Sequence, residues 1–449
     1  MILSLYVSTH RSFLAFISRL NLSFLKAVRL KIILILFPGM MVLPGVSQAV
    51  DLNPPPVLSA VPAAMKFEAP TSDTMAPTTM NFDALTRIGA IGLHPSDTSS
   101  VGAEKGKRVL VLSPSPDNKR NSEGAFITLR DGRVLFIYTH YGSGGNGDHD
   151  VACLMGRISG DGGKTWSEKD QLILENEGAM NIMSVSLLRL HNGSIALFYL
   201  RKNSTEDCIP VMRLSADEGK RWGPPVDCIT DRKGYFVLNN DRAIQLSGGR
   251  ILLPVALHKV PGDPTWNNKA KLFCYYSDDN GKSWKAGSQV PDTTAIITQE
   301  PGVVERKDGK VMMFIRASGG YQQFSLSADR GVTWSPIRSM EVASPLSPAS
   351  IKKIPSTGDW LMVWNHNDGS LPETKGERTP LTVAVSRDEG KSWDHVANLE
   401  TDPDGWYCYT AIHFHKKHVL LGYCAGSQKA GTHLDVAAIR RIRIKELYR

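Results

Sequence analysis

One eight-residue pattern occurs five times along this chain and constrains its fold more than any other feature. Each copy has the form Ser-x-Asp-x-Gly-x-x-Trp, and the copies begin at Ser159, Ser215, Ser277, Ser327 and Ser386. In such a turn the Asp can hydrogen-bond the backbone, the Gly can adopt a positive φ and the Trp can cover the core beneath. The pattern therefore predicts a repeat architecture in which the copies are hairpin turns and not catalytic residues.

Strand-like alternation surrounds the five copies and extends them to six units. In each unit an apolar strand, a turn and a second strand precede a third strand that leads into the pattern. The second strands are expected at 134–139, 195–200, 251–257, 311–315, 360–364 and 419–423. The sixth unit lacks the pattern; we expect its third strand at Leu434–Ile444 and its fourth at Val109–Leu112, which closes the ring with the N-terminal part. Six units of four strands predict an all-β fold, a six-bladed β-propeller, and fit a β-sandwich poorly.

Two segments precede the repeats. Residues 1–49 hold five basic residues, no acid and a late apolar stretch, which predict an export signal; the alternative, a retained membrane anchor, is disfavoured by Pro38 and Pro44. Residues 50–107 are rich in Pro, Ala and Thr and predict an arm or linker, and residues 108–449 form the predicted propeller. We therefore expect an exported protein, periplasmic or secreted, without a membrane span once the signal is removed.

Composition excludes several classes of function. The net charge is +8, but residues 1–49 supply five of these charges, and no basic run is interleaved with aromatic residues, so no nucleic-acid partner is expected. The six cysteines permit disulfides after export, and Cys208–Cys228 and Cys408–Cys424 are the two candidate pairs. No Cys-x-x-Cys motif occurs, so a zinc site is not expected. We expect no metal and no cofactor.

A propeller gathers its functional residues around the central axis, at one end of the inner strands. The ends of the second strands place six residues there: His140, Arg201, His258, Arg316, His366 and Tyr423. The starts of the first strands add six more: Glu123, Asn239, Asp241, Arg242, Glu300 and Tyr409. Several arginines favour an acidic sugar, because the guanidinium fork binds a carboxylate through two parallel hydrogen bonds. A buried Glu300 can act as a base, or it can form a purely structural ion pair with Arg316.

These repeats resemble the sialidase (neuraminidase) family, specifically its bacterial members with BNR, or Asp-box, repeats. The resemblance covers residues from about 108 to 447 and rests on three stretches. Gln299–Glu305 with Phe314–Arg316 is similar to the family's Glu-x-Gln-Val … Asn-Ala-Arg, and Arg378–Val383 is similar to the strand that carries another carboxylate-binding arginine. Leu420–Tyr423 is similar to the Leu-Leu-Tyr that carries the nucleophilic tyrosine.

The resemblance implies a retaining mechanism with a tyrosine nucleophile. It implies that Tyr423 is the nucleophile and Glu300 the base that activates it, while Arg316 and Arg378 bind the sugar carboxylate. A neutral tyrosine suits this substrate, because a carboxylate nucleophile would be repelled by the carboxylate on the anomeric carbon. Tyrosine is weakly nucleophilic at its free pKa, near 10, so an adjacent Glu must take its proton.

The first unit departs from the family pattern. The family opens with Arg-Ile-Pro, whose arginine also binds the carboxylate, whereas the aligned stretch here is Asn121–Gly124 and Arg120 is one residue out of register. Arg242 is the candidate replacement. The acid and base is expected in the loop after the second strand, where Asp148 is preferred and Asp150 and His149 remain open. Four more residues are expected around the substrate: Glu123, Arg201, Asp241 and His149.

We therefore predict an exported, exo-α-sialidase-like glycoside hydrolase from a divergent branch, which releases terminal sialic acid from glycoconjugates. Sialylated or other acidic glycans are its expected partners. Two alternatives remain open. One is a glycosidase or lyase that acts on another acidic sugar, such as a uronate, and the other is a glycan-binding propeller without catalytic activity.

Overall fold

The structure, a computed structural model, describes residues 92–93, 105–370 and 372–449. The predicted export signal and most of the predicted arm lie outside these residues. Within the described part, the regular structure is β-strand apart from two short 3₁₀ helices, η3 (Pro372–Thr374) and η4 (Ile444–Tyr448). That part of the chain contains no helix of the length and hydrophobicity needed to cross a membrane. The predicted all-β class is therefore confirmed for the described residues.

The strands form five sheets. The first sheet consists of β3 (Arg120–Thr128), β4 (Val134–Tyr141), β5 (Ala152–Ser159) and β6 (Gln171–Leu174). A later four-stranded sheet consists of β16 (Thr298–Glu305), β17 (Val311–Ala317), β18 (Tyr321–Ser327) and β19 (Arg338–Ala343). The next consists of β20 (Ser350–Lys353), β21 (Trp360–Asn365), β22 (Leu381–Ser386), β23 (Ser392–Glu400) and the short β1 (Gly92–Leu93).

A nine-stranded sheet holds two of the predicted units. The first half consists of β7 (Asn181–Arg189), β8 (Ile195–Ser204), β9 (Asp207–Ser215) and β10 (Val226–Asp227). The second half consists of β11 (Tyr235–Val237), β12 (Ile244–Gln245), β13 (Ile251–Lys259), β14 (Lys271–Ser277) and β15 (Lys285–Ala286). A single parallel contact, Tyr235 opposite Cys208, joins the halves.

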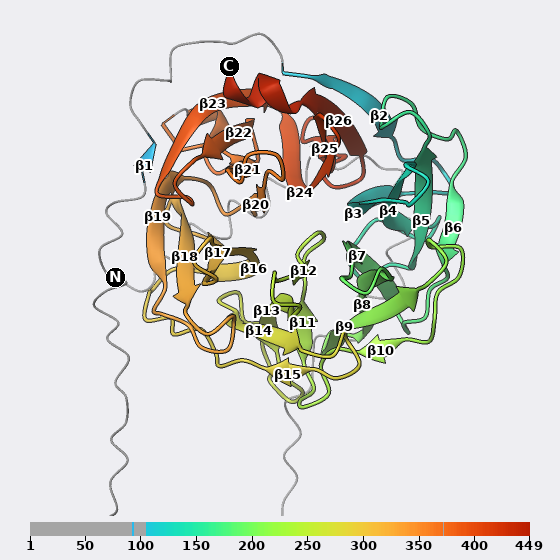
Figure 1. The fold of residues 1–449 in the computed structure, drawn as a ribbon, viewed down its shortest axis with the longest axis horizontal. Helices are drawn as coiled ribbons and strands as arrows, with labels where there is room; N and C mark the ends of the chain where they lie inside the picture. Colours follow the sequence, from blue (N-terminus) through green and yellow to red (C-terminus); the bar gives the residue numbers. More distant parts are fainter. Residues whose placement is uncertain (1–91, 94–104, 371) are drawn as a thin grey trace, which may run out of the picture. The chain divides into compact units, whose positions relative to one another are not determined.

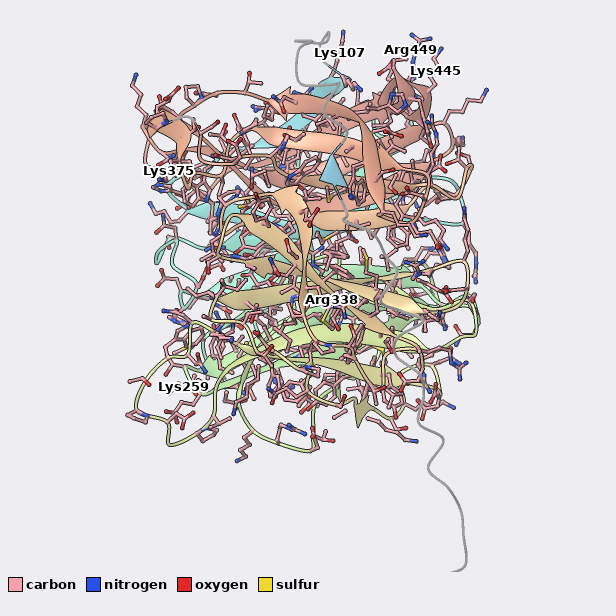
Figure 2. The ribbon with its side chains drawn as sticks, turned by 90° about the vertical axis from the view of Figure 1, so that its left-hand side faces the viewer. Lys107, Lys259, Arg338, Lys375, Lys445 and Arg449 are labelled. Carbon is pink, nitrogen blue, oxygen red and sulfur yellow. The ribbon has the colours of Figure 1, made fainter. Side chains whose placement is uncertain are left out.

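The fifth sheet brings the two ends of the described chain together. It consists of β24 (Gly405–His415), β25 (His418–Ser427), β26 (Ala437–Arg443) and β2 (Lys107–Leu112), with β2 antiparallel to β26. The predicted fourth strand at Val109–Leu112 is confirmed. Lys105 Nζ also donates a hydrogen bond of 2.9 Å to the Arg449 carbonyl oxygen, and Figure 2 shows Lys107, Lys445 and Arg449 at the same edge.

The sheets follow one another in chain order around a common axis in Figure 1, with β3, β7, β12, β16, β20 and β24 innermost. All six second strands occur where they were predicted, as β4, β8, β13, β17, β21 and β25, and several run beyond their predicted ends. Each hydrophobic cluster lies between neighbouring sheets. For example, Phe126 and Phe136 of the first sheet pack against Leu420 and Ile439 of the fifth. The interfaces between sheets therefore form the core. Burial of one such side chain stabilises the fold by about 1.5–3 kcal/mol.

The five pattern copies are turns, as predicted. In the copy at Ser327, the Ser327 hydroxyl donates to Asp329 and accepts the Gly331 N–H at 2.8 Å. Asp329 in turn accepts the backbone N–H of Thr333 at 2.8 Å and its hydroxyl at 2.6 Å. Gly331 has a φ of +90°, and the corresponding glycine is positive in every copy. The Ser and Asp side chains that define the pattern therefore make hydrogen bonds within the turn itself.

All six cysteines are free in the structure. Of the two candidate pairs, Cys408 and Cys424 stand opposite each other on β24 and β25. The strand partners of Cys208 are Lys202 and Tyr235, and the backbone N–H of Cys228 donates to the Pro210 carbonyl oxygen. Cys208 and Cys228 are therefore not opposite each other in the sheet.

Candidate active site

The site is built from irregularities in the inner strands. In β3, β7, β16 and β24 the pairing with the second strand gains one extra residue near the axis. At each of these bulges one residue other than glycine has a positive φ: Glu123 (+55°), Ser184 (+61°), Glu300 (+42°) and Tyr409 (+54°). A bulge redirects a side chain, and backbone strain of this kind concentrates at functional sites. Four sheets thus turn a polar side chain towards one place.

These four side chains line one cavity of about 410 Å³. Its charged lining consists of Glu123, Asp148, Lys202, Glu300, Arg316 and Arg378. Its aromatic and imidazole lining consists of His149, Tyr235, His258, Trp266 and Tyr409. In the described part of the chain, no group of three His, Cys, Asp or Glu side chains is arranged to hold a metal ion. The cavity has the size of a small-molecule site, and its charged lining suits a polar ligand.

Tyr409 and Glu300 form the centre of the cavity. The Tyr409 hydroxyl donates to Glu300 Oε1 at 3.2 Å, and Arg316 Nη1 donates to Glu300 Oε2 at 2.7 Å. Burial alone would raise the pKa of Glu300, but Arg316, Arg378 and the Asn239 amide outweigh it and lower that pKa. Burial, and then the charge of Glu300, raise the pKa of Tyr409. The pair is therefore a neutral phenol that donates to an ionised carboxylate.

Two arginines stand beside this pair. The guanidinium of Arg378 lies 4.9 Å from the centre of the Trp406 ring and 5.4 Å from that of Tyr409. Arg378 Nη1 and Arg316 Nε are buried and make no hydrogen bond to a nitrogen or oxygen of the described residues. Buried N–H groups are normally satisfied, so these two indicate acceptors that a ligand would supply.

Two further lining residues, Glu123 and Asp148, belong to a second charged group, which is joined by the buried Arg120. Arg120 Nη2 donates to Glu123 Oε1 at 3.1 Å, and its Nη1 donates to Asp148 Oδ1 at 2.6 Å. Glu123 is buried at 7% exposure, whereas the Asp148 side chain is 58% exposed. Lys202 is also buried, donates to the Asp148 carbonyl oxygen, and lies 5.4 Å from the centre of the Tyr235 ring. The predicted Asp148, His149 and Glu123 thus share one cavity with Glu300.

Tyr423 does not lie in this cavity. It is 2% exposed, and its hydroxyl donates to Glu400, with Arg440 at 3.5 Å. The strand β25 runs on to Ser427, so Tyr423 lies mid-strand, and its side chain packs in the cluster between the last two sheets. The expected pairing of Tyr423 with Glu300 is therefore wrong, and Tyr409 stands in that position.

Three further expected residues lie elsewhere. Arg242 is 3% exposed and donates to the Ala349 carbonyl at 2.6 Å and to Ser350 Oγ at 3.1 Å, so it does not reach the cavity. Asp241 accepts from Lys352 Nζ at 2.6 Å and, with Arg242, lines a separate cavity of about 230 Å³. Arg201 pairs with Asp227 at 2.9 Å outside the site. These placements correct the expectation that the three would surround the substrate.

Sequence reasoning missed Lys202, Ser184, Tyr235 and Trp266 as lining residues. Lys202 lies two residues beyond the predicted end of its strand, on the same face as Leu200, and the unexpected length of β8 carries it into the site. The available signal was a second basic residue, directly after Arg201, on the face of the strand that Arg201 does not share. Trp266 belongs to a loop between β13 and β14, where its ring stacks on His258 with centroids 4.8 Å apart.

Comparisons with known proteins agree with this fold. The family model described as a BNR repeat-like domain matches residues 177–419. A sialidase from Bacteroides fragilis is 25% identical over 331 residues, which are 66% of this chain and 58% of that protein. A sialidase from Paraclostridium sordellii is 27% identical over 244 residues, 49% of this chain and 56% of that one. The chain thus spans a little over half the length of these relatives.

Solved structures show the same fold at lower identity. The leech intramolecular trans-sialidase aligns with a TM-score of 0.60 and 14% identity, covering 77% of this chain and 71% of that one. A protein of unknown function from Dyadobacter fermentans aligns with a TM-score of 0.59 and 18% identity, covering 75% of this chain and 99% of that one. At such identities the likeness concerns the fold alone.

Proposed function

Because the chain belongs to the BNR-repeat family, as a divergent member of the bacterial sialidases, we propose that it is a glycoside hydrolase that releases terminal sialic acid from glycoconjugates. One observation carries this proposal: Tyr409, Glu300, Arg316 and Arg378 meet in one cavity. A phenol hydrogen-bonded to a carboxylate is an activated nucleophile, and two arginines with unsatisfied N–H groups beside it suit a carboxylate on the sugar.

In this proposal Tyr409 takes the role first expected of Tyr423. Glu300 accepts the Tyr409 proton while the phenolic oxygen attacks the anomeric carbon, which gives a covalent intermediate and net retention. Arg316 serves twice, because its Nη1 holds Glu300 while its Nε remains available to the substrate. Arg378, whose guanidinium lies 5.4 Å from the centre of the Tyr409 ring, aligns the substrate carboxylate. Such positioning accounts for a large share of catalysis in enzymes of this kind.

The proton for the leaving oxygen comes, in this proposal, from the carboxyl pair of Glu123 and Asp148. Both line the same cavity as Tyr409, and Arg120 bridges them. Hydrolysis then requires the same group to activate water in the second step.

We also propose that the sheets form a six-bladed β-propeller. The six second strands in chain order, the five turns and the pairing of β2 with β26 support six blades, with units two and three joined through β11. Export remains part of the proposal and rests on the basic and apolar sequence of residues 1–49. N-terminal sequencing of the protein from a periplasmic or culture fraction tests it, and a mature chain that retains residue 1 contradicts it.

A second candidate substrate follows from the first unit, which lacks the family's Arg-Ile-Pro and places the carboxyl group of Glu123 in the cavity. This carboxyl group can accept from a hydroxyl group of the sugar while Arg316 and Arg378 bind the sugar's own carboxylate, so a uronate is the alternative substrate. A panel of uronic acid glycosides alongside sialosides distinguishes the two. Release of sugar from uronic acid glycosides and not from sialosides would show that the substrate is a uronate and would contradict the sialidase proposal.

The test uses the purified full chain with a fluorogenic sialic acid glycoside and with sialyllactose. We expect release by the wild type and by Tyr423→Phe, and a loss of at least about 10³-fold in Tyr409→Phe, because the nucleophile is removed. Full activity of Tyr409→Phe would contradict the assigned role. Absence of release from both substrates would contradict the sialidase proposal.

A further inference from the structure

Two carboxyl groups in the cavity share one guanidinium but differ in surroundings. Asp148 lies on a glycine-rich loop with its side chain 58% exposed, and it accepts the shorter bond from Arg120, 2.6 Å. Glu123 lies at the bulge of β3, with its side chain 6% exposed, and accepts the longer bond, 3.1 Å. When two carboxyl groups occupy environments this different, they take different roles in proton transfer.

The surroundings of Asp148 favour its ionised form. Burial acts to raise its pKa, but Arg120, Lys202 and His149 outweigh burial and lower it. Lys202 Nζ also donates to the Asp148 carbonyl oxygen, which fixes this residue beside two cations. A carboxylate held ionised in this way has no proton to give at neutral pH.

The surroundings of Glu123 favour a protonated carboxyl. Burial, and then the nearby Asp148, raise its pKa and outweigh Arg120, the Ser184 hydroxyl and Lys202, which lower it. The Ser184 hydroxyl donates to Glu123 Oε2 at 2.6 Å, so each oxygen accepts one bond and a protonated carboxyl still has an O–H to direct into the cavity. The titratable groups that face it are Arg120, Tyr141, Asp148, Lys202, Tyr235 and Cys424.

The backbone supports the same conclusion. Glu123 occupies the bulge of β3 with a φ of +55°, the counterpart of Glu300 on β16 and Tyr409 on β24. Glu300 and Tyr409 have chemical roles in the proposed mechanism, and Ser184, at the fourth bulge, donates to Glu123. If the chain only had to turn at this position, glycine would adopt the positive φ without strain. The strained conformation of Glu123 is therefore better explained by its side chain, which it directs into the cavity.

We propose that Glu123, and not Asp148, is the proton donor to the glycosidic oxygen. This inference rests on the proposed function. As the bond from the anomeric carbon to the leaving oxygen breaks, the proton of Glu123 passes to that oxygen, Tyr409 Oη bonds to the carbon and Glu300 takes the Tyr409 proton. In the second step the Glu123 carboxylate takes a proton from water, whose oxygen bonds to the carbon, and Tyr409 leaves and regains its proton from Glu300.

Arg120 and Asp148 are positioning residues in this scheme. The guanidinium stabilises the Glu123 carboxylate formed after the first step, and Asp148 holds the guanidinium from the other side. The scheme predicts different consequences for the two carboxyl groups. Loss of the donor removes proton transfer and affects poor leaving groups most, whereas loss of Asp148 leaves the donor in place and lowers the pKa of Glu123.

The experiment compares Glu123→Gln with Asp148→Asn in the full chain, using two glycosides of one sugar, an aryl glycoside with a good leaving group and an alkyl glycoside with a poor one. We expect Glu123→Gln to lower kcat/KM for the alkyl glycoside by about 10²–10⁴-fold, the usual contribution of a general acid, and far less for the aryl glycoside. Asp148→Asn keeps the donor, so at pH values below the pKa of Glu123 the ratio should stay near that of the wild type. The basic limb of the alkyl glycoside profile should move to lower pH, because the Asp148 charge that raises the pKa of Glu123 is removed.

The ratio of kcat/KM for the aryl glycoside to that for the alkyl glycoside decides between the two residues. If this ratio increases in Asp148→Asn at all pH values and stays unchanged in Glu123→Gln, the inference is overturned while the proposed function stands. If Glu123→Gln does not fold, the pH profile of Asp148→Asn decides. Its alkyl glycoside profile should keep a basic limb if Glu123 is the donor and should lose that limb if Asp148 is. Inactivity of the wild type on both glycosides would instead contradict the proposed function together with the inference.

Discussion

At the scale of single residues, two tyrosines of the last sheet have opposite surroundings. Tyr409 is strained and faces a cavity, whereas Tyr423 is packed between sheets and donates to Glu400. We predict that Tyr423→Phe lowers the free energy of unfolding by about 1.5–3 kcal/mol, because a buried hydrogen bond to a charged group is lost, and leaves kcat/KM unchanged. Urea unfolding and steady-state kinetics check both parts. An inactive variant of native stability would contradict this assignment.

The charge of Arg316 makes a second prediction at this scale, on pH dependence. Arg316 lowers the pKa of Glu300, and the proposed reaction needs Glu300 ionised. Removal of the cation in Arg316→Met raises that pKa, so the acidic limb of kcat/KM should move to higher pH. Arg201→Met is the matched control. Arg201 follows the apolar run of the second strand in its unit, as Arg316 does in its own, but it pairs with Asp227 outside the site. An unshifted limb in Arg316→Met would show that Glu300 does not set it.

At the scale of elements, the turns predict a specific sensitivity to acid. Hydrogen bonds from Ser283 and Ser277 outweigh the opposing effect of burial and lower the pKa of Asp279 from 3.8 to about 2. A carboxylate whose pKa is lower in the folded than in the unfolded chain stabilises the fold at pH values above its unfolded pKa. This stabilisation is lost as the pH falls towards the folded pKa, about 2. Asp279→Asn should therefore lower Tm at pH 7 and flatten the fall of Tm between pH 4 and 2.

The control for this prediction is Asp117→Asn. Asp117 is exposed, and its side chain makes no hydrogen bond within the described residues. A thermal scan of both variants across pH should separate them. Equal behaviour of Asp279→Asn and Asp117→Asn would mean that the turn carboxylate contributes nothing to folding.

The inner strands show what the sequence could and could not predict. Short apolar runs located all six second strands, since a strand buried on both faces has few polar residues. It did not reveal the extra residue between Cys408 and Ala411, and a single inserted residue changes the face on which every later side chain lies. The start of the strand placed Tyr409 near the axis, but motif similarity then favoured Tyr423. Glu300, Arg316 and Arg378 were predicted because they lie in or beside short stretches with a recognisable order.

At the scale of the whole molecule, the described fold depends on a strand from its N-terminal end. The strand β2 completes the sheet of β24–β26, and Leu112 contributes to the cluster shared with the first sheet. A chain that begins at residue 113 should unfold at a lower Tm and aggregate, because the edge of β26 becomes unpaired. A chain that begins at residue 105 keeps β2 and is the control. Equal cooperativity and Tm of the two chains would contradict this role of β2.

The central claim, that Tyr409 is the nucleophile, is tested most directly by trapping the intermediate. A fluorinated glycosyl fluoride of sialic acid, which slows the second step, is incubated with the full chain before digestion with trypsin and tandem mass spectrometry. The sequence separates the candidates, because cleavage after Lys391, Lys416, Lys417 and Lys429 puts Tyr409 and Tyr423 on different peptides. We predict the added sugar mass on Tyr409 within residues 392–416. Label on Tyr423 within residues 418–429, or no label from an enzyme that hydrolyses sialosides, would contradict the account.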